Sequence, residues 1–543
     1  MVSVEALELA DEQVVECRAC GRVPSPTAHV ASQSTSRVRV WCVQFGHHDP
    51  ALVMSGNLVA DTVAAETLGT ALRRGGYSED AVYRLLGEEA YSSERSDIPA
   101  DERRLPETPL ATLVRLFFLQ LPVTTEKAEV ALGRSGIDAL EATGLAEVAD
   151  EVIPRARLLP IGKLLLASDG FSRDADDPAD YVATYTPTAR VLDSLTPRPR
   201  VDRALDVGTG SGIHALLAAQ HAGQVIATDV NPRALAYTTL NAALNGLNNV
   251  ECRQGSLFEP VEGETFGLIT CNAPYVISPE TRWVYRDSEF SEDGVSERVL
   301  LSAAAHLADD GYAAMLVSWL AFDENAPDER VIGWAEASGC DSWILSTLNS
   351  DPLTHAAEWN SHLAGEALGD ALDEWARYFD DLGVELVSEG GVILHKRPGG
   401  GHSARVDELD EEDLDDAGDQ ILRAFEGRAR LAELRNDEAL LEERIGVASS
   451  LRLERELERA GSRAVDVEGS VDIAEGTKHT VDASADAQEV IASLDSRLRL
   501  AEVVDTTADR LGFDDEETEA LREETLEVIR ELLELGALHF RGD

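Results

Sequence analysis

The chain has 543 residues, of which 44% are hydrophobic and 27% are charged, a composition typical of a globular protein with about two to four domains. Its formal net charge of -54 at pH 7 opposes non-specific binding to nucleic-acid backbones and to anionic membrane surfaces. The longest apolar run, residues 109–123, contains Arg115 and is shorter than the ~18 apolar residues of a membrane-spanning helix. Because the acidic first segment also lacks the basic start of a secretory signal, the sequence predicts a cytoplasmic protein without a membrane partner.

Residues 1–60 differ in composition from the remainder and contain a Cys-x-x-Cys-Gly turn. Two thiolates on such a turn are a common half of a tetrahedral zinc site. The second half needs Cys42 with His47 or His48, whose spacing departs from the usual pattern. The sequence therefore leaves two interpretations open: an irregular leader, and a zinc knuckle formed by Cys17, Cys20, Cys42 and His47.

Residues 61–170 show a helical pattern of apolar residues and then two short extended runs, at 151–160 and 161–169. Several short helices followed by a hairpin are typical of a winged-helix-like domain. Domains of this kind bind nucleic acid in some proteins and act as scaffolds in others. Because the candidate second helix carries few basic residues, Lys127 and Arg134, we favour scaffolding or substrate docking over DNA reading.

Strands and helices alternate between residues 171 and 398, which predicts an α/β fold with a doubly wound, seven-stranded, Rossmann-like sheet. Near its end, residues 343–347 and 383–397 predict a further strand and an antiparallel hairpin. A Gly-rich and then acidic linker is expected at 399–420. The charged, helix-rich remainder predicts a helical C-terminal domain at 421–543.

The segment LDVGTGSG, residues 205–212, lies between a predicted strand and a predicted helix. Its glycines allow a sharp turn that brings backbone N–H groups close to a ligand. Asp229 ends the following strand, and a carboxylate at that place can bind both hydroxyls of a ribose. Asp206 is badly placed for a pyrophosphate but suits the cationic amino-acid end of S-adenosylmethionine. These features argue against a dinucleotide-dependent dehydrogenase.

A second motif, Asn272-Ala273-Pro274-Tyr275, follows another strand-like apolar run. The nitrogen of a side-chain amide or of adenine's exocyclic amine is a poor nucleophile, because its lone pair is delocalised. The Asn272 oxygen and a backbone carbonyl near Ala273 can accept its two N–H groups and direct the lone pair at a sulfonium methyl group. Tyr275 would then stack on the flat group, and Pro274 would fix the turn.

The motifs and their order along the chain resemble those of class I S-adenosylmethionine-dependent methyltransferases that carry an N-P-P-Y motif. That group includes the HemK-like protein glutamine N5-methyltransferases and the adenine N6-methyltransferases. The resemblance covers the middle domain and implies catalysis by the motif from Asn272 to Tyr275. It also implies a site for S-adenosylmethionine formed by Thr186, Asp206, Gly208, Thr209, Gly210, Gly212, Asp229, Val230, Ser256, Leu257 and Asn272.

Two positions depart from the family pattern, since Ala273 stands where the family usually has proline and Ser256 where it usually has an acidic residue. Because Ser256 lacks the charge that often receives the adenine amine, we expect weaker cofactor binding. The predicted reaction is methylation of a protein glutamine side chain, and the negative net charge favours a protein substrate. One alternative is methylation of adenine N6 in RNA or DNA, with the base flipped out of its stack. Another is a catalytically silent binding protein, which Asn272 at a strand end disfavours.

Overall fold

The computed structural model describes residues 61–541 apart from residues 93–94, 172–177, 179, 273, 280–291, 401, 411–412, 449–450 and 461–462. The candidate zinc ligands Cys17, Cys20, Cys42 and His47 lie outside the described residues, as does Ala273. Within the described ranges, no group of three or more His, Cys, Asp and Glu side chains is arranged to hold a metal ion. None of the helices in this part of the chain is long and apolar enough to cross a membrane.

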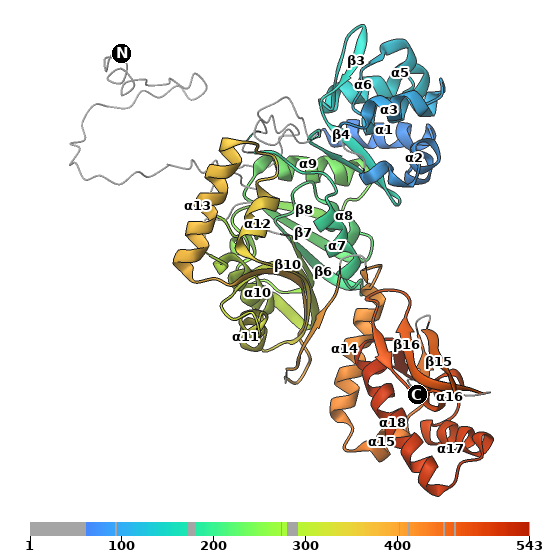
Figure 1. Ribbon diagram of the computed structural model, residues 1–543. Coiled ribbons are helices and arrows are strands. Elements are labelled where there is room, and N and C mark those ends of the chain that lie inside the picture. Colours follow the sequence, from blue (N-terminus) through green and yellow to red (C-terminus); the bar gives the residue numbers. More distant parts are fainter. Residues whose placement is uncertain are drawn as a thin grey trace. The chain divides into compact units, whose positions relative to one another are not determined.

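The N-terminal domain consists of short helices and small antiparallel sheets (Figure 1). Its helical segments are α1 (Thr62–Arg74), α2 (Glu79–Leu86), the 3-10 turn η2 (Glu88–Ser92), α3 (Ile98–Arg104), α4 (Pro109–Leu113), the π-helix η3 (Val114–Phe118), α5 (Thr125–Leu132) and α6 (Arg134–Thr143). Its strands are β1 (Val123–Thr124), β2 (Ala146–Val148) and β3 (Glu151–Pro154), in the order β1-β3-β2, and the hairpin of β4 (Arg157–Ile161) and β5 (Leu164–Ser168). The expected succession of helices and extended runs is present, whereas the winged-helix assignment stays a prediction.

The middle domain contains an eight-stranded sheet in the order β13-β11-β12-β10-β9-β6-β7-β8. Its strands are β6 (Val201–Val207), β7 (Ala222–Asp229), β8 (Val250–Gln254), β9 (Phe266–Cys271), β10 (Leu307–Ala321), β11 (Asp341–Ser350), β12 (Leu386–His395) and β13 (Ala404–Glu408). Its helical segments are α7 (Pro187–Leu195), α8 (Ile213–Ala218), α9 (Pro232–Leu244), the 3-10 turn η5 (Glu259–Val261), α10 (Gly294–His306), α11 (Glu329–Ser338), α12 (Pro352–Trp359) and α13 (Glu366–Leu382). Strand β12 runs antiparallel to both neighbours, and the other strand pairs are parallel. The predicted doubly wound α/β fold is confirmed.

The two faces of this sheet bury different side chains, as the alternation of residues along a strand requires. On β6, Leu205 and Val207 share an apolar core with residues of α10 and α11. Ala204, on the opposite face, belongs to a core that includes α8 and helices of the C-terminal domain. Figure 1 shows α8 and α10 on opposite sides of the sheet. The sheet is therefore covered on both faces, which explains why a central strand such as β9, FGLITC, is almost continuously apolar.

Two predictions near the end of the sheet are wrong. Residues 383–397 do not form a hairpin, because Leu386–His395 is the single strand β12. Its central Gly-Gly pair, which in sequence is typical of a turn, instead permits close strand approach: a Cβ on Gly390 would lie 2.2 Å from the carbonyl oxygen of Leu345. Residues Ala404–Glu408, predicted as part of the linker at 399–420, form the edge strand β13 and add an eighth strand to the sheet.

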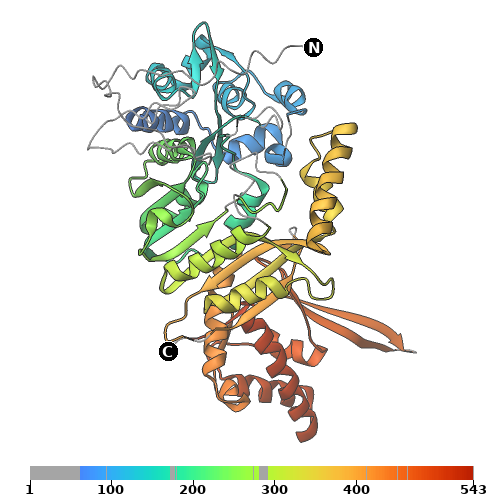
Figure 2. The ribbon, with the colours of Figure 1, turned by 90° about the vertical axis from the view of Figure 1, so that its left-hand side faces the viewer.

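The C-terminal domain combines the predicted helices with strands that the sequence did not indicate. The helices are α14 (Gly418–Glu433), α15 (Asp437–Leu441), α16 (Ala485–Ala492), α17 (Leu500–Leu511) and α18 (Asp515–Glu534). The strands are β14 (Ile445–Val447), β15 (Leu451–Ala460), β16 (Arg463–Ile473), β17 (Thr480–Asp482) and β18 (Leu538–Phe540). Figure 2 shows β15 and β16 as a long ribbon. The sequence of β15, LRLERELERA, consists of strong helix formers, but pairing with β16 outweighs that propensity.

Two asparagines attach β5 of the N-terminal domain to the middle domain. Asn241, fully buried on α9, exchanges two hydrogen bonds of 2.8 Å with the backbone of Ala167 and donates a third, also 2.8 Å, to the carbonyl of Ser211. Asn245 exchanges a similar pair, 2.9 and 2.8 Å, with the backbone of Leu165. These amides replace the neighbouring strand that β5 lacks along this edge. Because Ser211 lies in the glycine-rich segment, Asn241 also joins the N-terminal domain to that loop.

The carboxylate of Asp407, on β13, joins the sheet to the C-terminal domain. It accepts hydrogen bonds of 2.6 Å from the Trp343 indole and from Arg405, which also pairs with Glu531 of α18 at 2.7 Å. Burial raises the pKa of Asp407, but the hydrogen bonds and charges of His479 and Arg405 outweigh that effect and hold the pKa well below its usual range.

We expect the Asn241→Ala substitution to destabilise the protein by about 2–3 kcal/mol, because it leaves the buried N–H and C=O groups of Ala167 without partners. Urea unfolding measures this difference. The matched control is Asn248→Ala, at an exposed position beyond α9, which should change stability by less than about 0.5 kcal/mol. Equal effects of the two substitutions would contradict the role given to Asn241.

We expect Asp407→Asn to lower the thermal unfolding midpoint at pH 7 by about 2 °C or more. A carboxylate with a depressed folded-state pKa stabilises the fold above its unfolded pKa of about 3.9, and this contribution is lost as pH falls through the folded-state pKa. The difference between the variant and the native protein should therefore shrink below about pH 4. A difference that stays constant from pH 7 to pH 3 would show that the charge of Asp407 is not what stabilises this junction.

Candidate active site

The order of the strands reverses at β6, because the chain proceeds from β6 to β7 and β8 on one side and returns to β9 and β10 on the other. In open α/β sheets, ligands bind at the carboxyl edge beside such a reversal. Val207 is paired with Thr228 of β7 and with Cys271 of β9. The residues that follow these three, Gly208, Asp229 and Asn272, therefore lie side by side at this edge.

The glycine-rich loop after β6 depends on glycine for two different reasons. Gly208, Gly210 and Gly212 have φ angles of 68°, 55° and 90°, in the left-handed region that disfavours other residues. A Cβ on Gly212 would lie 2.8 Å from the hydroxyl of Thr238, so this glycine lets α9 pack on the loop. A Cβ on Gly210 would meet no atom of the described chain within 4 Å, so this glycine faces open space that a ligand can enter.

Asp206 lies beneath the loop with only 1% of its surface exposed. Its carboxylate accepts hydrogen bonds from the hydroxyl of Thr209 at 2.6 Å, from the N–H of Ala215 at 3.0 Å and from the hydroxyl of Thr270 at 2.9 Å. Burial raises the pKa of this carboxyl group, and the three hydrogen bonds act in the opposite direction. Both oxygens are thus engaged by the chain itself, so Asp206 orders the loop. Its contact with the ammonium group of a ligand stays a prediction.

Asp229, at the end of β7, is half-buried, whereas Asp206 is fully buried. One oxygen accepts a hydrogen bond from the N–H of Gly210 at 2.9 Å and the other from the N–H of Asn231 at 2.8 Å. Burial raises the pKa of Asp229, whereas these backbone donors lower it. The next side chain, Val230, is 45% exposed, so an apolar surface adjoins the carboxylate. An acid beside an apolar patch suits the ribose and base of a nucleoside.

The remaining predicted cofactor residues have local structural roles. Leu257 has a φ of 47°, and its carbonyl accepts a hydrogen bond of 3.2 Å from Thr228 on β7. Ser256, beside it, is half-buried and contributes its carbonyl to the turn that begins η5. Thr186 begins α7, where its hydroxyl accepts the N–H of Ala189 at 3.1 Å. Whether any of them contacts a cofactor stays a prediction.

Asn272 begins the loop that follows β9. Its half-buried side chain makes no hydrogen bond with the described residues, so its amide is available to another molecule. Beyond it the backbone is firmly held: the carbonyl of Tyr275 accepts a hydrogen bond from the hydroxyl of Ser318, and that of Ile277 accepts one from Nε2 of His355 at 3.1 Å. The loop can therefore keep Asn272 in a fixed position.

No sequence pattern indicated Ser318 or His355, which lie on β10 and α12. His355 is fully buried, and the side chains of Val276 and Ile277 pack in the same apolar cluster as Trp375 and Phe379 of α13. The pair α12 and α13, inserted between β11 and β12, thus forms the support of the loop. No local motif marks these residues, because their partners are far away in the sequence.

Sequence models of two families match the chain. Residues 186–319 match the methyltransferase small domain, and residues 74–157 match a domain of unknown function (DUF7059). The first match contains both the glycine-rich loop and the loop of Asn272. The second lies within the N-terminal domain.

Curated relatives are similar to part of the chain. The release factor glutamine methyltransferase of Xylella fastidiosa is 35% identical over 129 residues, which is 22% of this chain and 47% of that protein. The ribosomal protein uL3 glutamine methyltransferase of Bordetella pertussis is 32% identical over 186 residues, 31% of this chain and 62% of that protein. The chain therefore spans about half to three fifths of the length of these relatives. Among solved structures, a methyltransferase from Pyrococcus furiosus aligns with 43% of this chain and 89% of its own, at 18% identity and a TM-score of 0.26.

Gly210 and Gly212 of the glycine-rich loop allow a paired test. We expect Gly210→Ala to destabilise the protein by about 1–2 kcal/mol, the usual cost of a left-handed conformation. Gly212→Ala should cost clearly more, because its new methyl group also meets Thr238 at 2.8 Å. Urea unfolding of both variants measures the difference. Equal destabilisation would contradict the packing role of Gly212.

Proposed function

We propose that this protein, in which residues 186–319 belong to the methyltransferase small domain family, transfers the methyl group of S-adenosylmethionine to the amide nitrogen of a protein glutamine side chain. The observation that carries the proposal is the alignment of Gly208, Asp229 and Asn272 at one edge of the sheet. A cofactor loop and a group able to orient an amide are thereby adjacent.

The residues at this edge fit the cofactor. The open space at Gly210 leaves room for a ligand to lie against the backbone of the loop. Asp229 would receive the ribose hydroxyls, with Val230 beside the base. When bound, S-adenosylmethionine supplies a methyl group on a positively charged sulfur. Asp206 would act indirectly by keeping the loop in shape, because its oxygens already bind Thr209, Ala215 and Thr270.

Asn272 would orient the methyl acceptor. Its side-chain oxygen accepts one N–H of the substrate amide, which holds the nitrogen so that the lone pair faces the methyl carbon. S-adenosylmethionine held beside Asp229 would supply the methyl group, and sulfur would keep the electron pair of the S–C bond. The amide nitrogen held by Asn272 would gain the methyl group and lose one proton to water. Tyr275 would cover the flat amide, and its carbonyl, bound by Ser318, would keep the loop from shifting.

A protein substrate is favoured over nucleic acid by charge and by the relatives. A net charge of -54 opposes association with a phosphate backbone. The two relatives described above are named for methylation of glutamine in a release factor and in a ribosomal protein. We therefore propose a protein of the translation apparatus as the acceptor.

The proposal is tested with S-adenosylmethionine that carries a radiolabelled methyl group, incubated with cell extract and the purified protein. We expect label in a protein fraction, and we expect Asn272→Ala to reduce it about a hundredfold or more, the usual cost of losing one orienting hydrogen bond in a preorganised site. Asn272→Asp keeps an acceptor oxygen and should retain more activity than Asn272→Ala. The control is Asn248→Ala, at an exposed position, which should label normally.

Separation of protein from nucleic acid before counting decides between acceptors. Label in nucleic acid alone would replace glutamine by adenine as the acceptor. Undiminished labelling by a folded Asn272→Ala variant would remove Asn272 from the mechanism.

A further inference from the structure

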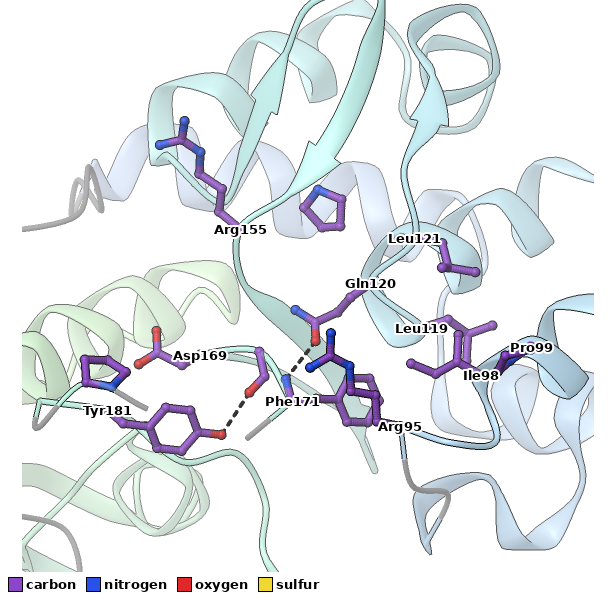
Figure 3. A pocket seen from close by; sticks show the side chains of 13 residues that line it. Arg95, Ile98, Pro99, Leu119, Gln120, Leu121, Arg155, Asp169, Phe171 and Tyr181 are labelled. Atoms are coloured by element: carbon purple, nitrogen blue, oxygen red, sulfur yellow. Dashed lines mark hydrogen bonds between the residues drawn. The ribbon is translucent and has the colours of Figure 1, made fainter. Parts of the chain in front are cut away.

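The described part of the structure contains a cavity of about 660 Å³ (Figure 3). Cavities of this size commonly hold ligands. None of the residues predicted for the cofactor or the methyl acceptor lines it. Its walls come from the N-terminal domain and from the segment that follows β5. Apolar side chains form much of the surface: Ile98, Leu119, Leu121 and Phe171.

Gln120 holds the two walls together in a strained conformation. It has a φ of 56°, which is unfavourable for a residue other than glycine, and it follows the π-helix η3. Its side-chain oxygen accepts the N–H of Phe171 at 2.9 Å. Strained residues and π-helices occur preferentially at functional sites. Their conformations lower the stability of the fold, and this loss is retained where the conformation serves a function.

The cavity has one cation without a counter-ion among the described residues. Arg95 is exposed at the cavity and forms no ion pair with any described residue. The other arginine in the wall, Arg155, pairs with Glu147 at 2.8 Å, and Figure 3 shows its guanidinium turned away from the other labelled side chains. A single guanidinium beside apolar walls is complementary to a carboxylate attached to an apolar body.

We propose that this cavity docks a segment of the protein substrate in which an acidic side chain neighbours a large apolar one. This inference rests on the proposed function, because it assumes a protein acceptor. Apolar walls with one free cation do not suit RNA, whose binding requires several cations along its backbone. A peptide segment supplies both the carboxylate and the apolar groups.

Hydrogen bonds connect the cavity wall to the proposed cofactor site. Asp169, in the wall, binds Arg233 of α9 at 2.5 Å. The carbonyl of Asp180 accepts the Asn231 side-chain amide at 3.0 Å, and the N–H of Asn231 binds Asp229 at 2.8 Å. A docked segment would therefore order the same residues that position Asp229, so peptide and cofactor should strengthen each other's binding.

The test is the fluorescence anisotropy of a fluorescein-labelled peptide, Gly-Leu-Asp-Phe-Gly, with the full-length protein. We expect Arg95→Ala to weaken binding about tenfold, the effect of losing one charge-assisted hydrogen bond. Replacing the aspartate of the peptide by asparagine should have a similar effect, and replacing its leucine and phenylalanine by serine should abolish binding. The matched control is Arg84→Ala, an exposed arginine on α2 that does not line the cavity.

Peptide binding that Arg95→Ala leaves unchanged, or that Arg84→Ala weakens equally, would overturn the inference. So would tighter binding of a labelled single-stranded RNA that depends on Arg95. The measurement needs no methyl transfer, and Asn272→Ala should bind the peptide normally. Loss of labelling in Asn272→Ala with no Arg95-dependent peptide binding would therefore refute the docking site and leave the proposed function standing. Arg95-dependent peptide binding without any methylation would support the docking site and refute the proposed function.

Discussion

The hydrogen bonds of one buried carboxylate hold together the sheet edge at which we propose the active site. Asp206 accepts hydrogen bonds from Thr209 of the glycine-rich loop, from Ala215 of α8 and from Thr270 of β9. These partners come from the three segments that must be in register if the loop is to lie beside Asn272. A carboxylate buried to this degree is costly unless its oxygens are satisfied, so the geometry of the loop and the position of β9 are coupled through this group.

Helix α9 extends this arrangement into the rest of the chain. At its start, Asn231 contacts Asp229, and near its end Asn241 contacts both the glycine-rich loop and β5 of the N-terminal domain. One helix thus touches the proposed cofactor site, the loop and the wall of the docking cavity. These contacts connect the N-terminal domain to the proposed cofactor site.

Sequence patterns predicted the features that are formed by residues close together in the sequence. The glycine spacing, Asp229 and the motif at Asn272 were correctly predicted to follow strands, because each motif lies on a single strand and its turn. Contacts between distant segments carried no such signal, and His355 and Asn241 were missed for that reason. The sequence placed the carboxylate of Asp206 near the loop but did not indicate its hydrogen bonds to Thr209, Ala215 and Thr270. Strands β13 and β15 were missed because their charged sequences are typical of linkers and helices.

We propose that the edge at Asn272 methylates the side-chain nitrogen of a glutamine in a protein. Mass spectrometry of the protein labelled in extract tests this most directly, because peptide fragmentation locates the added methyl group on one residue. The account predicts a single glutamine that carries one methyl group on its amide nitrogen and is unmodified when the Asn272→Ala variant replaces the native protein. A methyl group on any other kind of residue, or on that glutamine in the presence of the variant alone, would contradict it.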